Sequence, residues 1–167
     1  MNTPTTTLAK IRAARPCGLA IGGTLGYQLL AKTLGKDYGD DTPITVAQII
    51  ESNGLDDALW CLRTIPEFDN LWRHFAVDCA ERVAHLMTDE RSKNALTVAR
   101  QHAMGLATVD KLDAAWAAAW DSAGAAAGAA RDAARDSAWA TARKWQRIRL
   151  LALCEDGEWT PVSEVTE

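Results

Sequence analysis

Apolar residues recur along most of this chain of 167 residues at the three-to-four-residue spacing of amphipathic helices. The strongest example is the range 69–87, whose apolar flank consists of Leu71, Phe75, Cys79, Val83 and Leu86. Capping residues, prolines and glycines mark the ends of the other helical segments. They predict helices over 5–14, 24–34, 44–52, 55–64 and 89–104. The pattern therefore predicts an all-α protein.

The longest helical pattern covers residues 109–154 and is rich in alanine and tryptophan. At about 100° per residue, Trp116, Trp120 and Trp145 fall within about 40° of one another. We expect these large rings to line one seam of the helix, while the alanines let the backbone of a neighbouring helix approach closely.

The length of this segment limits how it can fold. A straight helix over 109–154 would measure roughly 65–70 Å, whereas a compact chain of this size has a diameter of about 40 Å. We expect a kink or break near Gly124 and Gly128, because a glycine costs a helix about 1 kcal/mol relative to alanine. A protruding end that pairs with a second copy as a homodimer is the alternative.

The predicted fold is thus a compact multi-helix bundle with a long, kinked or broken Ala/Trp-rich C-terminal helix. We expect one helical domain over 1–155, followed by an acidic tail over 156–167.

The net charge of −4 comes from the C-terminal end of the chain. Residues 155–167 contain five acidic residues and no basic one, so the remaining 154 residues carry a net charge of +1 (18 basic minus 17 acidic). A nucleic-acid-binding protein normally presents a basic face that neutralises phosphates. No such face is evident, and we expect no direct binding to nucleic acid.

The sequence also bears on the compartment. It contains no stretch of 18 uncharged apolar residues, and its opening segment lacks an apolar core long enough for a signal peptide. Its four cysteines, Cys17, Cys61, Cys79 and Cys154, form no C-x-x-C pair. We expect reduced thiols, no membrane association and a cytoplasmic location in a bacterial host cell.

One polar pattern could carry chemistry. His74, Asp78, Glu81 and His85 recur at successive turns of the predicted helix over 69–87. Two imidazoles and two carboxylates can ligate a divalent cation, and Asp78 can orient a histidine as a general base. Ion pairs between turns of a solvated helix give the same pattern. We favour that structural interpretation, and a metal-dependent enzyme is the alternative.

Other signatures of catalysis or cofactor binding are weak. The glycines between 18 and 26 do not match the spacing G-x-G-x-x-G of a dinucleotide loop. The serines are scattered, and only three histidines are present, so no nucleophile with a converging base is evident. We expect neither a cofactor nor a bound metal, and no enzymatic activity.

A second set of charged residues is expected to be structural. Because Asp78 and Arg82 border the apolar flank of the helix over 69–87, at least one of them should enter a helix interface. The interface network that we expect consists of Asp56, Asp57, Arg63, Asp78 and Arg82. Such a network fixes helix register while desolvation offsets most of its attraction. The functional alternative is that Arg82 binds a ligand or a partner's carboxylate.

Three ordered blocks of the sequence carry a resemblance to a known family. They are LDDALWCLR at 55–63, FAVDCAERV at 75–83 and NALTVARQHAMGLATVDKLDAAWAAAW at 94–120. Together they resemble a family of immunity proteins, found in bacterial toxin clusters and in phages, that carry Ala/Trp-rich C-terminal repeats. The resemblance covers roughly residues 50–145, and ARPCG at 14–18 is similar to the family's opening block more loosely.

The resemblance implies a helical protein that binds a toxin or a host defence effector and blocks it sterically. Exposed aromatic rings beside small residues are typical of interaction hot spots. The candidate contact residues are Trp116, Trp120, Trp139, Trp159, Asp132 and Asp136. Two alternatives stay open: all the tryptophans fill the core, or the protein is a phage anti-defence protein, such as an anti-CRISPR inhibitor of an RNA-guided nuclease.

Overall fold

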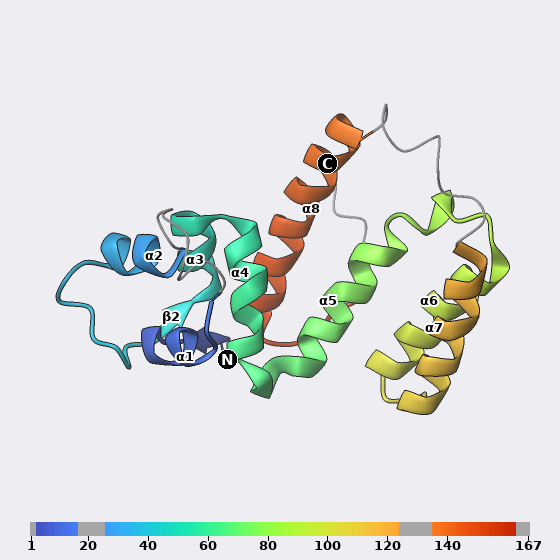
Figure 1. Cartoon of the computed structure of the whole chain (residues 1–167), viewed down its shortest axis with the longest axis horizontal. Helices are drawn as coiled ribbons and strands as arrows, with labels where there is room; N and C mark the ends of the chain where they lie inside the picture. Colours follow the sequence, from blue (N-terminus) through green and yellow to red (C-terminus); the bar gives the residue numbers. More distant parts are fainter. Residues whose placement is uncertain (1–2, 17–25, 124–134, 163–167) are drawn as a thin grey trace. The chain divides into compact units, whose positions relative to one another are not determined.

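The computed structural model describes residues 3–16, 26–123 and 135–162, and nearly all of its regular structure is helical (Figure 1). The all-α prediction is confirmed. The chain divides into two compact units. Unit 1 comprises residues 1–69 and 147–159, and unit 2 comprises residues 70–146 and 160–167. The expected single domain over 1–155 stays a prediction.

Unit 1 contains a small sheet that the helical periodicity did not predict. Strand β1 (Thr5–Thr6) pairs antiparallel with β2 (Ile44–Thr45). The helices expected from residues 5 and 44 therefore begin later, as α1 (Leu8–Ala13) and α3 (Val46–Asn53). The β-branched Thr and Ile residues at these positions favour the extended backbone that the pairing uses.

A threonine side chain caps the helix that follows each of the two strands. Thr7 is extended, and its hydroxyl accepts a hydrogen bond from the Lys10 amide. Thr45 forms a complete capping box with Gln48, because each side chain binds the backbone N–H of the other residue. Each strand thus leads directly into the first turn of a helix.

The other helical elements of unit 1 are short helices and the last part of the long helix α8. They are α2 (Gly26–Leu34), α4 (Leu55–Cys61), η1 (Leu62–Thr64), η2 (Pro66–Phe68) and the last part of α8 (Arg135–Asp156). The largest fully buried apolar side chains of the unit are Pro4, Leu30, Ile44, Val46, Ile49, Ile65, Leu150 and Leu153. Among them, Thr6 and Thr64 share a buried hydroxyl–hydroxyl hydrogen bond of 2.6 Å, which satisfies both polar groups.

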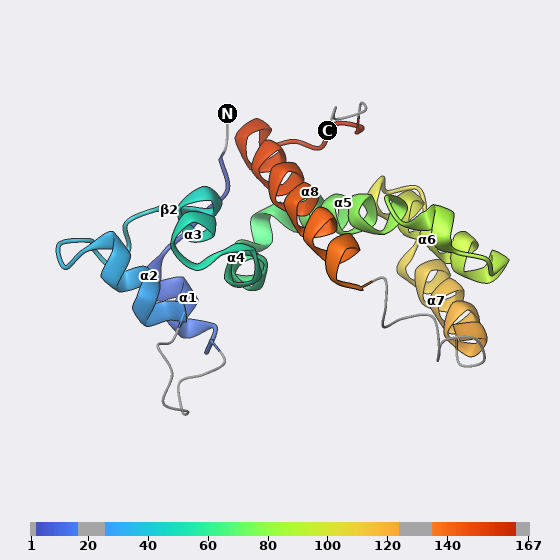
Figure 2. The same ribbon diagram turned by 90° about the horizontal axis from the view of Figure 1, so that it is seen from above.

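Unit 2 is built from nearly all of α5 (Asp69–Glu81), η3 (Ala84–Leu86), α6 (Glu90–Ala103), α7 (Val109–Ala123) and the first part of α8. Asp89 caps α6 by accepting hydrogen bonds from two backbone amides of its first turn. The chain then reverses through Gly105, which has a positive φ of 74°. As a result, α6 and α7 lie side by side as a helical hairpin (Figures 1 and 2).

Alanine packs the two helices of this hairpin together. Ala95 and Ala103 of α6 and Ala115 of α7 are all buried. Side chains of this size let helix backbones approach more closely than larger side chains would. The small alanine side chains fit the close helix approach that the sequence predicts, and Ala115 is enclosed on α7.

The structure describes the long Ala/Trp-rich segment on either side of residues 124–134. Helix α7 ends at Ala123, and α8 begins at Arg135. The kink or break expected near Gly124 and Gly128 lies outside the described residues. Helix α8 ends at Asp156, and the residues from there to 162 form no further helix or strand. The homodimer through the long helix stays a prediction.

The hairpin packing leads to a prediction about two alanines of α7. Ala115→Leu should lower the free energy of unfolding by about 1–3 kcal/mol, because three extra carbons must enter a closely packed contact. Ala117→Leu is the matched control, since Ala117 is exposed on the same helix; there the change should be within about 0.5 kcal/mol. Urea denaturation followed by circular dichroism measures both, and equal effects would contradict close packing at Ala115.

Candidate functional site

An apolar groove lies on the α6–α7 hairpin of unit 2. It has a volume of about 280 Å³ and is lined by Met87, Ser92, Ala95, Leu96, Ala99, Trp116 and Ala119. Ser92 is the single polar residue among these described lining residues. Trp116 is 60% exposed. The groove therefore combines a large exposed ring with alanine walls.

The position of Trp116 follows from the way α7 begins and packs. Thr108 precedes the helix, and its hydroxyl lies 3.4 Å from the Lys111 amide, as expected for an N-cap. From this start, Ala115 falls on the face that contacts α6. Trp116 is turned about 100° from it, so the ring stands at the edge of the hairpin contact, where it borders the groove.

The other tryptophans of the predicted seam and contact surface are in different environments. Trp145 is only 8% exposed, and the Arg82 guanidinium lies 5.0 Å from its ring centre. Trp116 and Trp145 thus lie on different helices with opposite exposure, and they do not form one exposed seam. Trp159 is partly buried. Residue Asp132 and the side chains of Trp120, Trp139 and Asp136 lie outside the described part of the structure.

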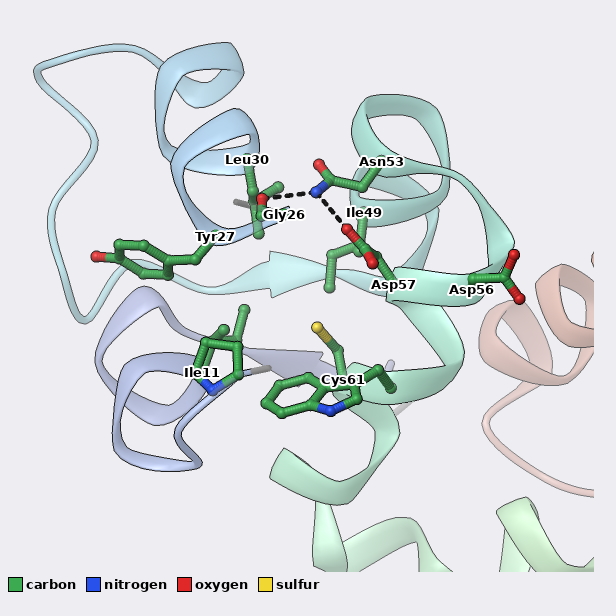
Figure 3. Close-up of a pocket in the computed structure, with 11 residues that line it drawn as sticks. Ile11, Gly26, Tyr27, Leu30, Ile49, Asn53, Asp56, Asp57 and Cys61 are labelled. Atoms are coloured by element: carbon green, nitrogen blue, oxygen red, sulfur yellow. Dashed lines mark hydrogen bonds between the residues drawn. The ribbon is translucent and has the colours of Figure 1, made fainter. Parts of the chain in front are cut away.

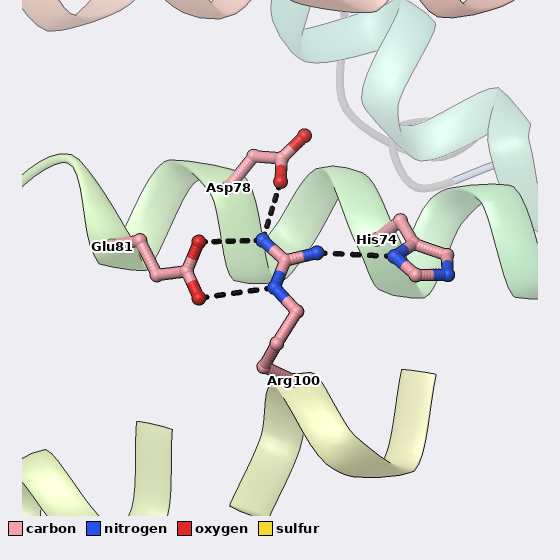
Figure 4. A network of polar contacts seen from close by, with 4 residues as sticks. All are labelled: His74, Asp78, Glu81 and Arg100. Carbon is pink, nitrogen blue, oxygen red and sulfur yellow. Dashed lines mark hydrogen bonds and ion pairs between the residues drawn. The ribbon is translucent and has the colours of Figure 1, made fainter. Parts of the chain in front are cut away.

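A polar network links α5 and α6 within unit 2 (Figure 4). Arg100 of α6 reaches across to three side chains of α5. Its guanidinium donates to Asp78 at 2.5 Å, to both carboxylate oxygens of Glu81 at 2.6 and 3.0 Å, and to Nδ1 of His74 at 3.0 Å. The Asp78 side chain is 1% exposed and that of Arg100 15%. The network is therefore a largely buried ion pair extended by a more exposed carboxylate.

The chemistry of arginine determines the protonation of its histidine partner. A guanidinium has only donors, so Nδ1 of His74 must accept, and the proton of the neutral ring lies on Nε2. Burial lowers the pKa of Arg100, but its hydrogen bonds to Glu81 and Asp78 raise this pKa above its ordinary value. The guanidinium thus stays charged and balances the carboxylate of Asp78.

The structure brings together three members of the predicted ladder and separates the fourth. His74, Asp78 and Glu81 converge on Arg100 (Figure 4). The expected helix over 69–87 stops at Glu81, and His85 lies exposed in η3. The last turn tightens here, since the Val83 amide bonds the carbonyl three residues earlier.

This arrangement bears on metal binding. Asp78 and Glu81 direct oxygen atoms at a cationic side chain, which occupies the place that a metal ion would take between them. Among the described residues, no group of three or more His, Cys, Asp or Glu side chains is arranged to hold a metal ion. What the three residues do in this structure is connect two helices.

Arg100 is the functional residue of this network that the sequence analysis missed. It is 22 positions from Asp78 in the chain, and helical periodicity relates only residues within a few turns of one another. A signal was present: a carboxylate such as Asp78, at the border of an apolar flank, needs a cation from another helix.

Two residues of the expected charge network, Asp57 and Arg63, make local contacts. In unit 1, Asp57 accepts a hydrogen bond of 2.8 Å from the Asn53 amide. Arg63 donates to the Trp60 carbonyl at 2.9 Å and lies over the Trp60 ring. The remaining members are Asp56, which lies in unit 1, and Asp78 and Arg82, which lie in unit 2.

Within the described residues, the cysteines are not joined by a disulfide: Cys61 and Cys154 are buried, and Cys79 is partly buried. Burial, with a smaller contribution from Asp57, raises the pKa of Cys61 to about 12. Burial and Glu155 likewise raise the pKa of Cys154 to about 12. Cys17 lies outside the described residues.

None of the helices in the described part of the chain is long and apolar enough to cross a membrane. Comparison of this chain with known protein families, curated proteins and solved structures gives no match. The resemblance to immunity proteins therefore stays a prediction from the sequence blocks, and the geometry of the groove must support any functional proposal.

The polar network leads to a prediction about Arg100. Arg100→Met should lower the free energy of unfolding by about 3 kcal/mol, because it leaves the buried carboxylate of Asp78 without its cation. Lys93→Met is the matched control on the same helix, since Lys93 pairs with Glu90 at the surface; its cost should be below about 1 kcal/mol.

A double variant separates loss of the ion pair from loss of packing. In Arg100→Met with Asp78→Asn no buried charge remains, so part of the lost stability should return. Urea denaturation of the unaltered chain, the two single variants and the double variant gives the coupling free energy between Arg100 and Asp78. Additive effects of the two substitutions would show that the network does not stabilise unit 2.

The raised thiol pKa values lead to a prediction about alkylation. At pH 8 a thiol with a pKa of about 12 is only about 0.01% thiolate, so Cys61 and Cys154 should react with iodoacetamide at least about 100-fold more slowly in the folded protein than in urea. Mass spectrometry of timed samples measures the rates. If Cys61 and Cys154 of the folded protein were labelled at the rate of the unfolded chain, their raised pKa values would be refuted.

The same shift has a defined sign for stability. Below pH 9 the thiols of Cys61 and Cys154 are protonated in the folded and in the unfolded protein. Their contribution to the free energy of unfolding is therefore fully present there. As the pH rises from about 9 to about 12, the thiols of the unfolded chain ionise first, and the folded state loses stability.

Proposed function

We propose that this chain is a non-enzymatic protein inhibitor, similar in action to immunity proteins, that binds and neutralises a toxin or a defence effector. The observation that carries the proposal is Trp116, which is 60% exposed beside the apolar groove of the α6–α7 hairpin. The resemblance of the sequence blocks to immunity proteins adds the kind of partner.

The exposed ring can supply substantial binding energy. An aromatic side chain can bury about 200 Å², so covering the exposed 60% of Trp116 removes roughly 120 Å² from water. At about 25 cal/mol per Å², this burial stabilises a complex by about 3 kcal/mol. That value is typical of a hot-spot residue.

The surroundings of Trp116 also suit recognition of a protein. Ala95, Ala99 and Ala119 leave room beside the ring for an apolar side chain of the partner. Because Ala115 makes the contact with α6, the hairpin does not need Trp116 to fill its own core. The ring is attached to a regular helix, so little backbone entropy is lost when a partner covers it.

A binding experiment tests the proposal. The full chain is mixed in turn with each product of the genes that adjoin its own, and affinity is measured by biolayer interferometry beside the activity of each product. One product should bind and lose its activity. Trp116→Ala should weaken that affinity about 100-fold, which corresponds to about 3 kcal/mol.

Leu106→Ala is the matched control, because Leu106 is 69% exposed on the same hairpin but does not line the groove. It should change the affinity less than about threefold. An equal loss in both variants would refute the role of the groove. A bound product that stays fully active would refute neutralisation, and the absence of any binding product would refute a toxin encoded beside this chain as the target.

A further inference from the structure

Unit 1 contains a second cavity, which the proposed function does not use. It lies among α1, α2, α3 and α4 and has a volume of about 290 Å³ (Figure 3). Its apolar lining includes Ile11, Leu30, Ile49 and Cys61, and its aromatic lining is Tyr27 and Trp60. Since a water molecule in the liquid occupies about 30 Å³, the space suits a ligand of roughly ten non-hydrogen atoms.

Both aromatic residues of the lining are held by arginines. Arg12 donates two hydrogen bonds to the Tyr27 hydroxyl, at 2.7 and 3.2 Å, and is itself paired with Asp40 at 2.8 Å. Arg63 places its guanidinium 4.6 Å from the centre of the Trp60 ring. These contacts fix the rings before any ligand binds, which lowers the entropy that binding costs.

The polar end of the cavity is formed by Gly26, Asn53 and Asp57 (Figure 3). The Asn53 amide donates to the Gly26 carbonyl at 2.6 Å and to the Asp57 carboxylate at 2.8 Å. A Cβ atom on Gly26 would overlap Oδ2 of Asp57. Glycine is therefore required here for the carboxylate to sit against the start of α2.

This end has more acceptors than donors. Oδ1 of Asn53 is buried and has no hydrogen-bond partner within the described part of the chain, and in Figure 3 it lies on the side of the amide away from Asp57. The described residues that line the cavity include Asp56 and Asp57 but no Lys, Arg or His. In Figure 3 the carboxylate of Asp57 faces Asn53 and Gly26, whereas that of Asp56 points away from them. A bound group that complements this end must bring N–H donors and positive charge.

We propose that this cavity binds a small organic cation, with an ammonium group at Asp57 and an apolar or aromatic body between Leu30, Ile49 and Trp60. An ammonium supplies three donors and a charge that Asp57 attracts. A carboxylate ligand would be repelled by Asp57, and a neutral ligand would leave that charge without a counterion. The proposal does not depend on the Trp116 groove, which lies in unit 2.

The test uses 2-phenylethylamine, 2-phenylethanol and 3-phenylpropionate, which share a benzene ring and a short chain but differ in charge. Each is titrated into the full chain, and the Trp60 indole and Gly26 amide signals are followed by NMR. The amine should bind with a Kd on the order of 1 mM, the alcohol at least about tenfold more weakly, and the carboxylate without saturation. Equal binding of amine and alcohol, or no saturable binding of the amine, overturns the proposal.

Two neighbouring acids supply the matched variants. Asp57→Asn should weaken binding of the amine about tenfold and leave the alcohol unchanged, whereas Asp56→Asn should change the amine less than about twofold. Equal losses in the two variants overturn the assignment to Asp57. If Asp57→Asn does not fold, the comparison of the three ligands on the unaltered chain still decides the proposal.

Discussion

Close approach of α6 and α7 is the constraint on which the candidate interaction surface depends. Buried Ala95, Ala103 and Ala115 make the contact, so the helices pack without large side chains between them. A contact filled by alanine has no space for the indole of the next residue, and Trp116 stays at its edge. The same small residues that hold the hairpin together thereby create both the exposed ring and the shallow walls of the groove beside it.

The Arg100 network solves a different problem in the same unit. Asp78 is almost completely buried, and a buried carboxylate is costly unless a cation and hydrogen bonds compensate it. Arg100 supplies both, and Glu81 and His74 accept further hydrogen bonds from its guanidinium. Such a pair contributes modestly to net stability, but it permits few alternative pairings between α5 and α6. Its value lies in fixing which turns of the two helices face each other.

Unit 1 uses polar side chains to shape a cavity. Arginines hold the two aromatic residues, and Asn53 joins the start of α2 to Asp57 of α4. These contacts restrain the two rings and the polar end of the cavity, which lie beside its apolar lining. The two surfaces therefore suit different occupants: a protein side chain at the open groove of unit 2, and a small cation in the cavity of unit 1.

The sequence by itself determined the helical class, the start of α6 near Asp89, its end before Gly105 and the prominence of the Ala/Trp-rich segment, because periodicity and capping are local properties. The structure decided between Thr88 and Asp89 as the cap of α6. It could not determine that Thr6 pairs with Ile44, that Arg100 meets Asp78, or that Trp145 is buried while Trp116 is exposed. Each of these outcomes joins residues far apart in the chain or depends on what covers a helix face. Only tertiary packing decides such contacts, since many pairings satisfy the same local pattern.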